Sequence, residues 1–347
     1  MKKIFLLYLV LFFTLLMAAQ QKQVVKIQQA KPLEQVQESA SGKFTGMIFN
    51  DYFYIVKEPN PIDVTTGISG RNAFVMRRAF IGYDYSFTRD VSATVVYDAS
   101  TNLLTQGFAE IKNLVPLMDM KVGLSQTLSS DIVEKIWEYR SLDATILDKK
   151  GLTNEFDMGL TLTGRTNAQG TSYASVAMYN GTGPAVENNK VKKYAMAAGN
   201  WFNKSTVLEL YADYENVGGG KSTVTGKLFF GMSTLKYAFG AEAFYRMNRK
   251  FAGTTDVTPA GGSVFGWFEM MKSLRAVIRV DAADEDMRVT TTGYRDVYLN
   301  AGLDYMPVPE VHLIPNIEYG TLIKKGGAVA VIADDITVRL TTSVNFK

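Results

Sequence analysis

The last residues of the chain, "DITVRLTTSVNFK" (335–347), alternate between apolar and polar side chains. One parity holds Ile336, Val338, Leu340, Val344 and Phe346, interrupted only by Thr342. The other parity holds Thr337, Arg339, Thr341, Ser343 and Asn345. Because successive side chains of a β-strand point to opposite faces, the pattern predicts a strand with one apolar and one polar face. A sheet in a soluble protein can end in the same way, so the fold class depends on the rest of the chain.

The same period of two recurs upstream, and with the last segment it gives sixteen predicted strands. The other fifteen are 43–54, 74–87, 91–100, 107–113, 120–126, 155–164, 172–181, 192–202, 206–215, 223–232, 235–247, 263–271, 274–282, 296–306 and 311–320. An even number brings both chain ends to one side of a barrel, and sixteen strands enclose an aqueous channel. The sequence therefore predicts an all-β fold, an up-and-down antiparallel transmembrane β-barrel of sixteen strands.

The connections between these strands differ in length at the two ends of the predicted barrel. Those after even-numbered strands are short, such as 88–90 and 203–205. Those after odd-numbered strands are mostly longer, such as 180–190, 216–222 and 248–262. One short-turn end and one long-loop end are typical of outer-membrane barrels. A soluble secreted β-sandwich is the alternative, and the even strand count, the loop asymmetry and the N-terminal sequence favour the barrel.

The N-terminus, "MKKIFLLYLVLFFTLLMAAQQ" (1–21), has two lysines, an apolar run and two alanines. This layout is typical of a secretory signal peptide, and the run is short for a membrane anchor, which is the alternative. We predict a signal peptide at 1–19, a polar periplasmic tether at 20–42 and the barrel at 43–347. Export through a cleaved signal peptide and a barrel fold together predict location in the bacterial outer membrane.

Composition excludes several classes of function. The 347 residues include one histidine and no cysteine, which removes disulfides, thiol catalysis and Cys/His zinc sites. A formal charge of +3 argues against a nucleic-acid-binding protein. We therefore expect no enzyme, no cofactor, no metal site and no nucleic-acid partner.

Several motifs in order along the chain resemble the phosphate-selective porin O and P family. They are "FVMRRAFIGYDYSF" (74–87), "FAEIK" (108–112), "MKVGLSQ" (120–126), "FDMGLTLTG" (156–164), "YASVAMYNGTG" (173–183) and "VIRVDAAD" (277–284). The resemblance covers residues 43–347. It implies a sixteen-stranded outer-membrane barrel, commonly a homotrimer, that passes small anions or other small solutes by diffusion. The aromatic Phe346 near the chain end is similar to the signal read by the barrel-assembly machinery, although Lys347 follows it.

The longest connection, 127–153, follows the fifth predicted strand. A loop of this length is usually functional or disordered, and its apolar residues argue against a solvated tail. We predict that it folds into the lumen and narrows the channel, with Arg140 and Lys135 facing Glu134, Glu138 and Asp143. The alternative is an external loop that packs on neighbouring loops or on another protomer.

Charged side chains of the predicted inner face and of this loop are the candidate pore lining. They are Arg78, Lys112, Lys121, Arg140, Glu138, Asp157, Lys227, Glu242, Arg246, Arg275, Arg279, Asp281 and Arg339. Guanidinium groups offer a fixed fork of donors to anions, and opposed charges around a constriction orient polar solutes. Alternatively, each arginine is neutralised by a nearby carboxylate. The strands carry nine basic and ten acidic lumenal residues by this assignment, so the sequence does not support phosphate selectivity.

Two further features have both a functional and a structural interpretation. His312 on the inner face could act as a catalytic base, but no nucleophile motif accompanies it, and we interpret it as a polar wall residue. The acidic stretch 281–286 could hold a divalent cation, although a solvated loop is the preferred interpretation. We predict a passive outer-membrane porin for small polar or anionic solutes. The alternative is a non-conducting barrel that serves as an adhesin or structural surface protein.

Overall fold

The computed structural model describes residues 40–57, 69–187, 189–326 and 331–346. The predicted signal peptide and nearly all of the predicted tether therefore lie outside the described residues. The barrel begins at Ser41, two residues before the predicted boundary. No helix in the described part of the chain is long and apolar enough to cross a membrane.

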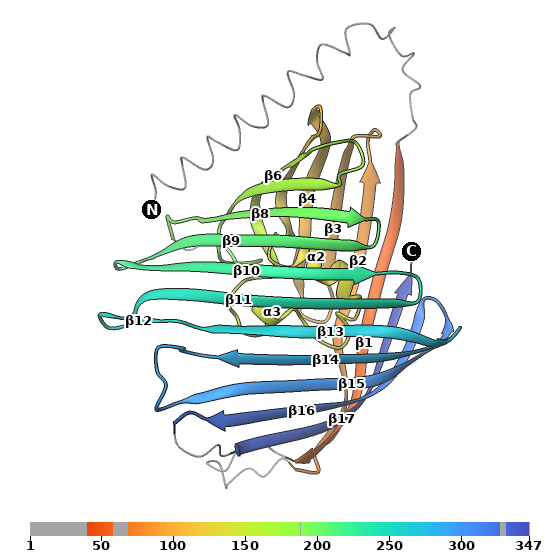
Figure 1. The fold of residues 1–347 in the computed structure, drawn as a ribbon. Helices are drawn as coiled ribbons and strands as arrows, with labels where there is room; N and C mark the ends of the chain where they lie inside the picture. Colours follow the sequence, from red (N-terminus) through yellow and green to blue (C-terminus); the bar gives the residue numbers. More distant parts are fainter. Residues whose placement is uncertain (1–39, 58–68, 188, 327–330, 347) are drawn as a thin grey trace, which may run out of the picture.

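A single antiparallel sheet makes up almost all of the described chain (Figure 1). Its strands are β1 (Ser41–Lys57), β2 (Asn72–Ser86), β3 (Val91–Asp98), β4 (Leu103–Val115), β5 (Met118–Gln126), β6 (Phe156–Arg165), β7 (Ser172–Tyr179), β8 (Lys193–Asn203), β9 (Thr206–Gly218), β10 (Lys221–Ser233), β11 (Tyr237–Ala252), β12 (Thr255–Val257), β13 (Ala260–Met271), β14 (Leu274–Asp284), β15 (Tyr294–Val308), β16 (Val311–Lys324) and β17 (Val331–Phe346).

The strands β12 and β13 form one interrupted strand of the barrel. Both pair with β11, and the pairs Asn248–Val257 and Tyr245–Ala260 belong to the same register. Across the interruption the Arg246 amide still donates to the Pro259 carbonyl at 2.8 Å. The barrel therefore has sixteen strands, and each predicted segment coincides with one of them.

The first and last strands close the sheet into a ring. β1 pairs with β2 on one side and with β17 on the other, from Gly46 opposite Phe346 to Tyr54 opposite Val338. Closure gives every strand two neighbours, which removes the unpaired edges that an open sheet exposes. The prediction of a closed sixteen-stranded antiparallel barrel is confirmed.

The two ends of the barrel differ less in loop length than the sequence suggests. The predicted loops 216–222 and 248–262 are wrong, because their strands continue through most of each segment. The hairpins turn instead at Gly219–Gly220 and at Gly253, and each of these glycines has a positive φ. Glycine adopts that conformation without steric penalty, so two residues suffice for the turn. The longer strands carry these hairpins beyond their neighbours at one end of the barrel (Figure 1).

Alternation along each strand separates two chemical surfaces. On β17, Val338, Leu340 and Phe346 are exposed on the outer face, whereas Thr341 and Ser343 are buried on the inner face. The last strand thus has the facing that its sequence predicts.

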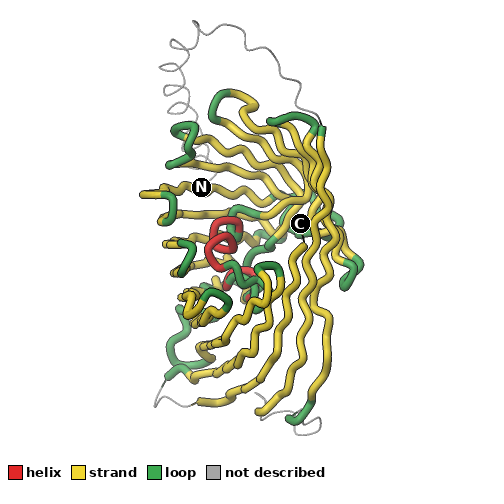
Figure 2. The backbone as a smooth tube through the Cα atoms, turned by 90° about the vertical axis from the view of Figure 1, so that its right-hand side faces the viewer, coloured by secondary structure: helices red, strands yellow, loops and turns green. Residues whose placement is uncertain are grey.

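The long connection after β5 lies inside the barrel (Figure 2). It contains two short helices, α2 (Asp131–Trp137) and α3 (Ile146–Lys149), and most of its apolar side chains are buried. We refer to residues 127–155 as the inner loop. The prediction that this connection folds into the lumen is confirmed.

Candidate pore and its lining

One face of the inner loop packs against the wall formed by β9 to β16. The cluster joins loop residues such as Val133, Ile136 and Trp137 to wall residues such as Phe229 and Phe265. The ring centroids of Trp137 and Phe265 lie 5.0 Å apart. Apolar burial of this kind is the main source of stability in a packed core, so this half of the lumen is filled.

Polar contacts attach the same face of the loop to the wall at several strands. Lys227 Nζ donates to the Ser129 carbonyl at 2.7 Å, and the Ile146 amide donates to Glu242 Oε1 at 3.3 Å. The Arg279 guanidinium donates to the Ala144 carbonyl. These bonds satisfy loop backbone groups that burial would otherwise leave without partners. They also fix the loop across the lumen.

Arg140 lies at the centre of the loop's charged cluster. Its Nε lies 3.3 Å from Glu134 Oε1 and donates to Glu155 Oε2 at 3.1 Å, and its Nη2 lies 3.4 Å from Asp148 Oδ2. One guanidinium group therefore contacts three carboxylates. Burial raises the pKa of Glu134 well above its usual value and Glu155 raises it further, while Arg140 opposes both effects. Burial and Glu155 raise the pKa of Asp148 in the same way.

The wall formed by β17, β1, β2 and β3 carries partly exposed arginines beside buried aspartates. Asp51 and Asp98 side chains are 4% and 1% exposed. Arg77, Arg78 and Arg339 are 26%, 39% and 22% exposed. Arg77 Nη2 donates to Asp51 Oδ1 at 3.2 Å, and Arg78 Nε lies 3.5 Å from Asp98 Oδ2. The aspartates contact the guanidinium groups, and Arg77 also donates to the Ser141 carbonyl of the inner loop, while Arg339 also contacts the Glu318 carboxylate.

Arg77 is a site residue that strict alternation misses. The β1–β2 register shifts between Phe49, which faces Arg78, and Asn50, which faces Met76. This β-bulge adds Arg77 to the inner face beside Arg78 and places Val75 opposite Asp51. The two adjacent arginines in the sequence could have indicated the bulge, because strict alternation would place one of them on the lipid-facing surface, where a charged side chain is unfavourable.

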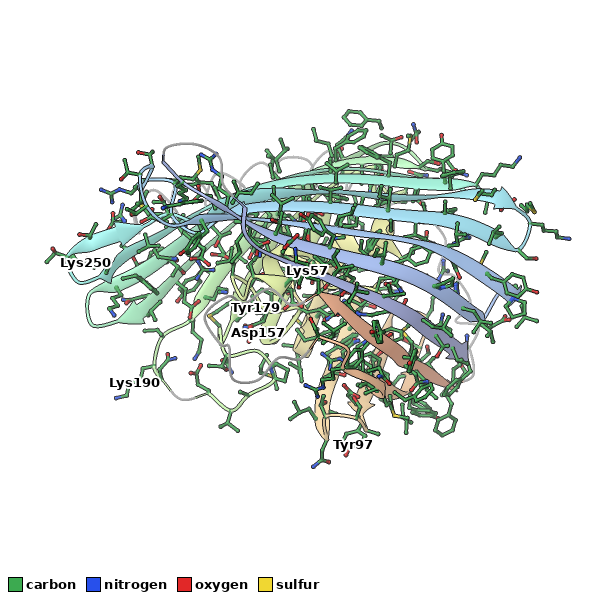
Figure 3. All side chains as sticks on the ribbon, turned by 90° about the horizontal axis from the view of Figure 1, so that it is seen from below. Lys57, Tyr97, Asp157, Tyr179, Lys190 and Lys250 are labelled. Carbon is green, nitrogen blue, oxygen red and sulfur yellow. The ribbon has the colours of Figure 1, made fainter. Side chains whose placement is uncertain are left out.

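The predicted pore-lining residues fall into two groups. Those with partly or well exposed side chains are Arg78, Lys112, Lys121, Glu138, Arg140, Arg275 and Arg339. Those almost fully buried are Asp157, Lys227, Glu242, Arg246, Arg279 and Asp281. Asp157 on β6 lies close to Tyr179 on β7, whereas Lys250 lies near the tip of the β11–β12 hairpin (Figure 3).

The almost fully buried residues form contacts that stabilise the barrel wall and the inner loop. Arg279 forms two bonds with Asp281, at 2.8 and 2.9 Å, and Lys227 Nζ lies 3.2 Å from Glu209 Oε1. Asp157 accepts the Gly181 amide at 2.9 Å. These pairs agree with the alternative that the buried arginines are neutralised by nearby carboxylates.

His312 and the acidic stretch 281–286 have structural partners. His312 Nδ1 lies 2.8 Å from Asp304 Oδ2, which also accepts the Tyr139 hydroxyl of the inner loop at 2.6 Å. The Lys325 ammonium contacts the Asp284 carboxylate and donates to the carbonyls of Asp286 and Val289. A lysine thus occupies the position that a cation bound by this acidic stretch would take.

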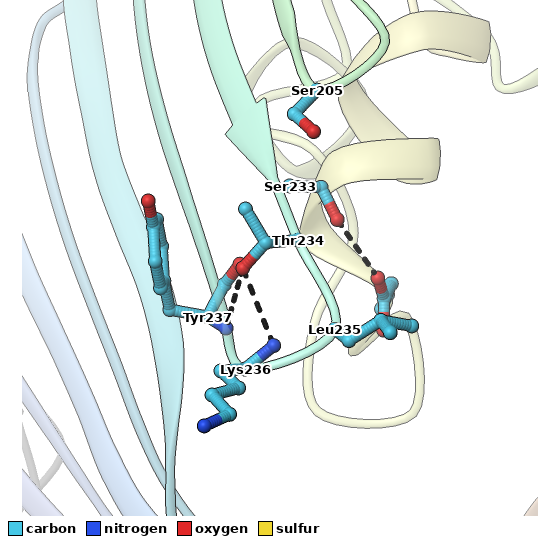
Figure 4. Close-up of a pocket in the computed structure, with 7 residues that line it drawn as sticks. Ser205, Ser233, Thr234, Leu235, Lys236 and Tyr237 are labelled. Atoms are coloured by element: carbon cyan, nitrogen blue, oxygen red, sulfur yellow. Dashed lines mark hydrogen bonds between the residues drawn. The ribbon is translucent and has the colours of Figure 1, made fainter.

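A hollow of about 700 Å³ opens at the short-turn end of the barrel (Figure 4). Glu138 enters it from the end of α2, Ser205 from the β8–β9 turn, and residues 233–237 from the β10–β11 connection. Ser233 Oγ lies 3.4 Å from Glu138 Oε1. The predicted residue Glu138 therefore lies at a mouth of the lumen.

Comparisons with solved structures show which fold this architecture represents. The outer membrane channel DcaP of Acinetobacter baumannii aligns with a TM-score of 0.63 and 12% identity, covering 91% of this chain and 100% of that one. The anion-selective porin of Comamonas acidovorans aligns with a TM-score of 0.62 and 9% identity, covering 89% and 100%. OmpF of Salmonella typhi aligns with a TM-score of 0.59 and 12% identity, covering 87% and 97%.

The chain therefore has the fold of outer-membrane porins. No family model matches the sequence, and no curated relative does. The resemblance to the phosphate-selective porin O and P family stays a prediction.

Proposed function

We propose that the protein is a passive diffusion channel of the bacterial outer membrane for small polar or anionic solutes. The observation that carries this proposal is the row of partly exposed arginines, Arg77, Arg78 and Arg339, inside a closed barrel. Apolar side chains cover the outside, as lipid requires, and the ring leaves no unpaired edge. Insertion by the barrel-assembly machinery and association as a homotrimer belong to the same proposal.

Size and charge would act together in selection. The inner loop packs against the wall from β9 to β16, and its Ser141 carbonyl also accepts a bond from Arg77 on β2, so the route for solutes would lie beside this contact. The near balance of nine basic and ten acidic residues predicted on the lumenal face does not imply a neutral route. At the β1–β2 wall the aspartates are buried and the arginines accessible, so the local potential favours anions.

Recording of the purified protein in planar bilayers tests the proposal. We expect defined conductance steps and, in a salt gradient, a reversal potential on the anion-preferring side. A reversal potential on the cation-preferring side would contradict the proposed preference for anions but would still support a diffusion channel. Absence of any conductance would instead favour the non-conducting structural barrel.

A further inference from the structure

Three apolar side chains of β1 and β2 face the lumen beside the row of arginines. Phe53 lies opposite Arg339 on β17, and Val75 lies opposite Asp51 on β1. Directly opposite residues of antiparallel strands share a face of the sheet, and Ile55 follows Phe53 on the same face. The inner face of a porin barrel is usually polar. We refer to Phe53, Ile55 and Val75 as the lumenal apolar patch.

The inner loop does not bury the lumenal apolar patch. Val75 is 39% exposed, and Phe53 and Ile55 are partly exposed. None of the three belongs to the apolar clusters that the described residues form between the loop and the wall. Exposed apolar side chains that lie together often mark a binding surface, whereas single ones need no explanation. The patch is therefore available to the apolar part of a solute.

Two guanidinium groups border the patch on the side toward the short-turn end. Arg339 is the cross-strand neighbour of Phe53, and Arg77 follows Val75 on the inner face of β2. Their side chains are 22% and 26% exposed. Because Arg77 also donates to the Ser141 carbonyl, the patch lies next to the contact between the inner loop and the β2 wall. A solute on the patch would therefore meet charge and apolar surface together.

The carboxylates near the patch already have positions of their own. Asp51 is buried beside Arg77 and Arg339, and Glu318 pairs with Arg339. The Asp335 side chain leans over Gly320 on β16, on the side of β17 away from β1. These acids offset much of the positive charge. The arginines would therefore attract an anion mainly through their accessible N–H donors, which suit a carboxylate.

We propose that this part of the lumen binds small carboxylates with an apolar body, the class to which aromatic monocarboxylates belong. The carboxylate accepts hydrogen bonds from Arg77 and Arg339, and the ring or alkyl part packs on the lumenal apolar patch. Sites for small molecules commonly combine apolar surface with a few placed polar groups in this way. A simple anion gains from the arginines alone, and a neutral aromatic compound gains from the patch alone. This assignment rests on the proposed function and narrows its class of solute.

Current recording in planar bilayers with benzoate tests the pairing of charge and apolar surface. Benzoate added to a chloride solution at constant ionic strength should lower the conductance saturably, because a bound solute obstructs the passage of chloride. Acetate has the charge without the ring, and benzamide has the ring without the charge. Each should require at least about tenfold higher concentration for the same effect, since each lacks one of the two contributions.

Substitution of Phe53 tests the location of the site. Phe53→Ser should weaken the benzoate effect about fourfold or more, the factor that corresponds to loss of one methylene-sized apolar contact. Phe53→Leu keeps an apolar side chain and should keep the effect. Tyr54→Ser is the matched control, because Tyr54 is the next residue of β1 and lies on the outer face, 44% exposed. Its benzoate titration should match that of the native channel.

The results separate this inference from the proposed function. Chloride conductance without a benzoate effect, an equal effect of acetate or benzamide, or an unaffected Phe53→Ser channel would each overturn the carboxylate site and leave the channel. Absence of any conductance would refute the channel. Calorimetric titration of benzoate into the full-length protein in detergent, against protein-free micelles, then decides the site: saturable binding that Phe53→Ser weakens would support it, and no binding would overturn it.

Discussion

At the scale of single residues, exposure separates arginines that meet solutes from arginines that hold the fold. Arg78 is the most exposed of the three arginines over Asp51 and Asp98, whereas Arg279 is 1% exposed. We expect Arg78→Ala to reduce the preference for anions. One unit charge at about 4 Å in water contributes about 1 kcal/mol, so the local concentration of a monovalent anion should fall by up to about fivefold. The reversal potential in a salt gradient measures this change.

Arg279→Ala should act on stability instead. The substitution leaves Asp281 buried without its guanidinium partner, which costs about 3–5 kcal/mol. Thermal unfolding in detergent should show the loss, with Arg288→Ala in the exposed 285–293 loop as the matched control. Because its side chain is 1% exposed, we propose that Arg279 holds the wall to the inner loop and does not line the route. A large shift in reversal potential with unchanged thermal stability would contradict the assignment.

Glu134 makes the stability of the inner loop depend on pH. Burial and Glu155 raise its pKa in the folded protein, so the folded state keeps a proton that the unfolded chain loses above about pH 4.3. Stability should therefore fall as pH rises from that value through the raised pKa. Glu134→Gln should remove this component and give a higher melting temperature than the native protein at neutral pH. Melting temperatures of both proteins from pH 4 to 8 measure the effect, and equal slopes would refute it.

At the scale of elements, the inner loop depends on its apolar anchor. Trp137→Ala removes a buried ring that contacts Phe265 and should cost about 3–5 kcal/mol. We expect the loop to loosen on the β13 side, with faster proteolysis within 127–155 and noisier single-channel currents. Phe202→Ala, at an exposed position on β8 outside this apolar cluster, is the control. Unchanged protease resistance would show that the polar attachments alone hold the loop.

Alternation predicts these elements well because each strand has one apolar and one polar face. Alternation predicts pore residues less well, because a side chain that points to the inner face of the barrel is not always accessible to a solute. Asp51, Asp98 and Asp157 face inward yet are buried, and only the fold shows which residues cover them. Arg77 faces inward only because a β-bulge interrupts the period of two. The strand β11 is longer than predicted because its hairpin turns at a glycine within a stretch whose composition is typical of a loop. Composition alone cannot distinguish that turn from a long loop.

At the scale of the whole molecule, closure depends on the last strand. Deletion of 335–347 removes most of β17 and leaves β1 and β16 with unpaired edges. Because unpaired backbone groups are unfavourable in lipid, we expect no folded barrel in membranes. The electrophoretic mobility of unheated samples in SDS distinguishes folded from unfolded barrels. Deletion of Lys347 alone keeps the Gly46–Phe346 pair and should leave that mobility unchanged, whereas a folded truncated barrel would show that β17 is dispensable.

The tall hairpins β9–β10 and β11–β12 make one side of the rim higher than the rest (Figure 1). If the short turns face the periplasm, these hairpins would extend farthest from the outer surface of the membrane. Antibodies and bacteriophages would then contact this part of the protein first. The turn at Gly219–Gly220 is then a natural place to graft a foreign epitope. A peptide inserted there would be displayed at the end of an extended β-hairpin, away from both the lumen and the lipid.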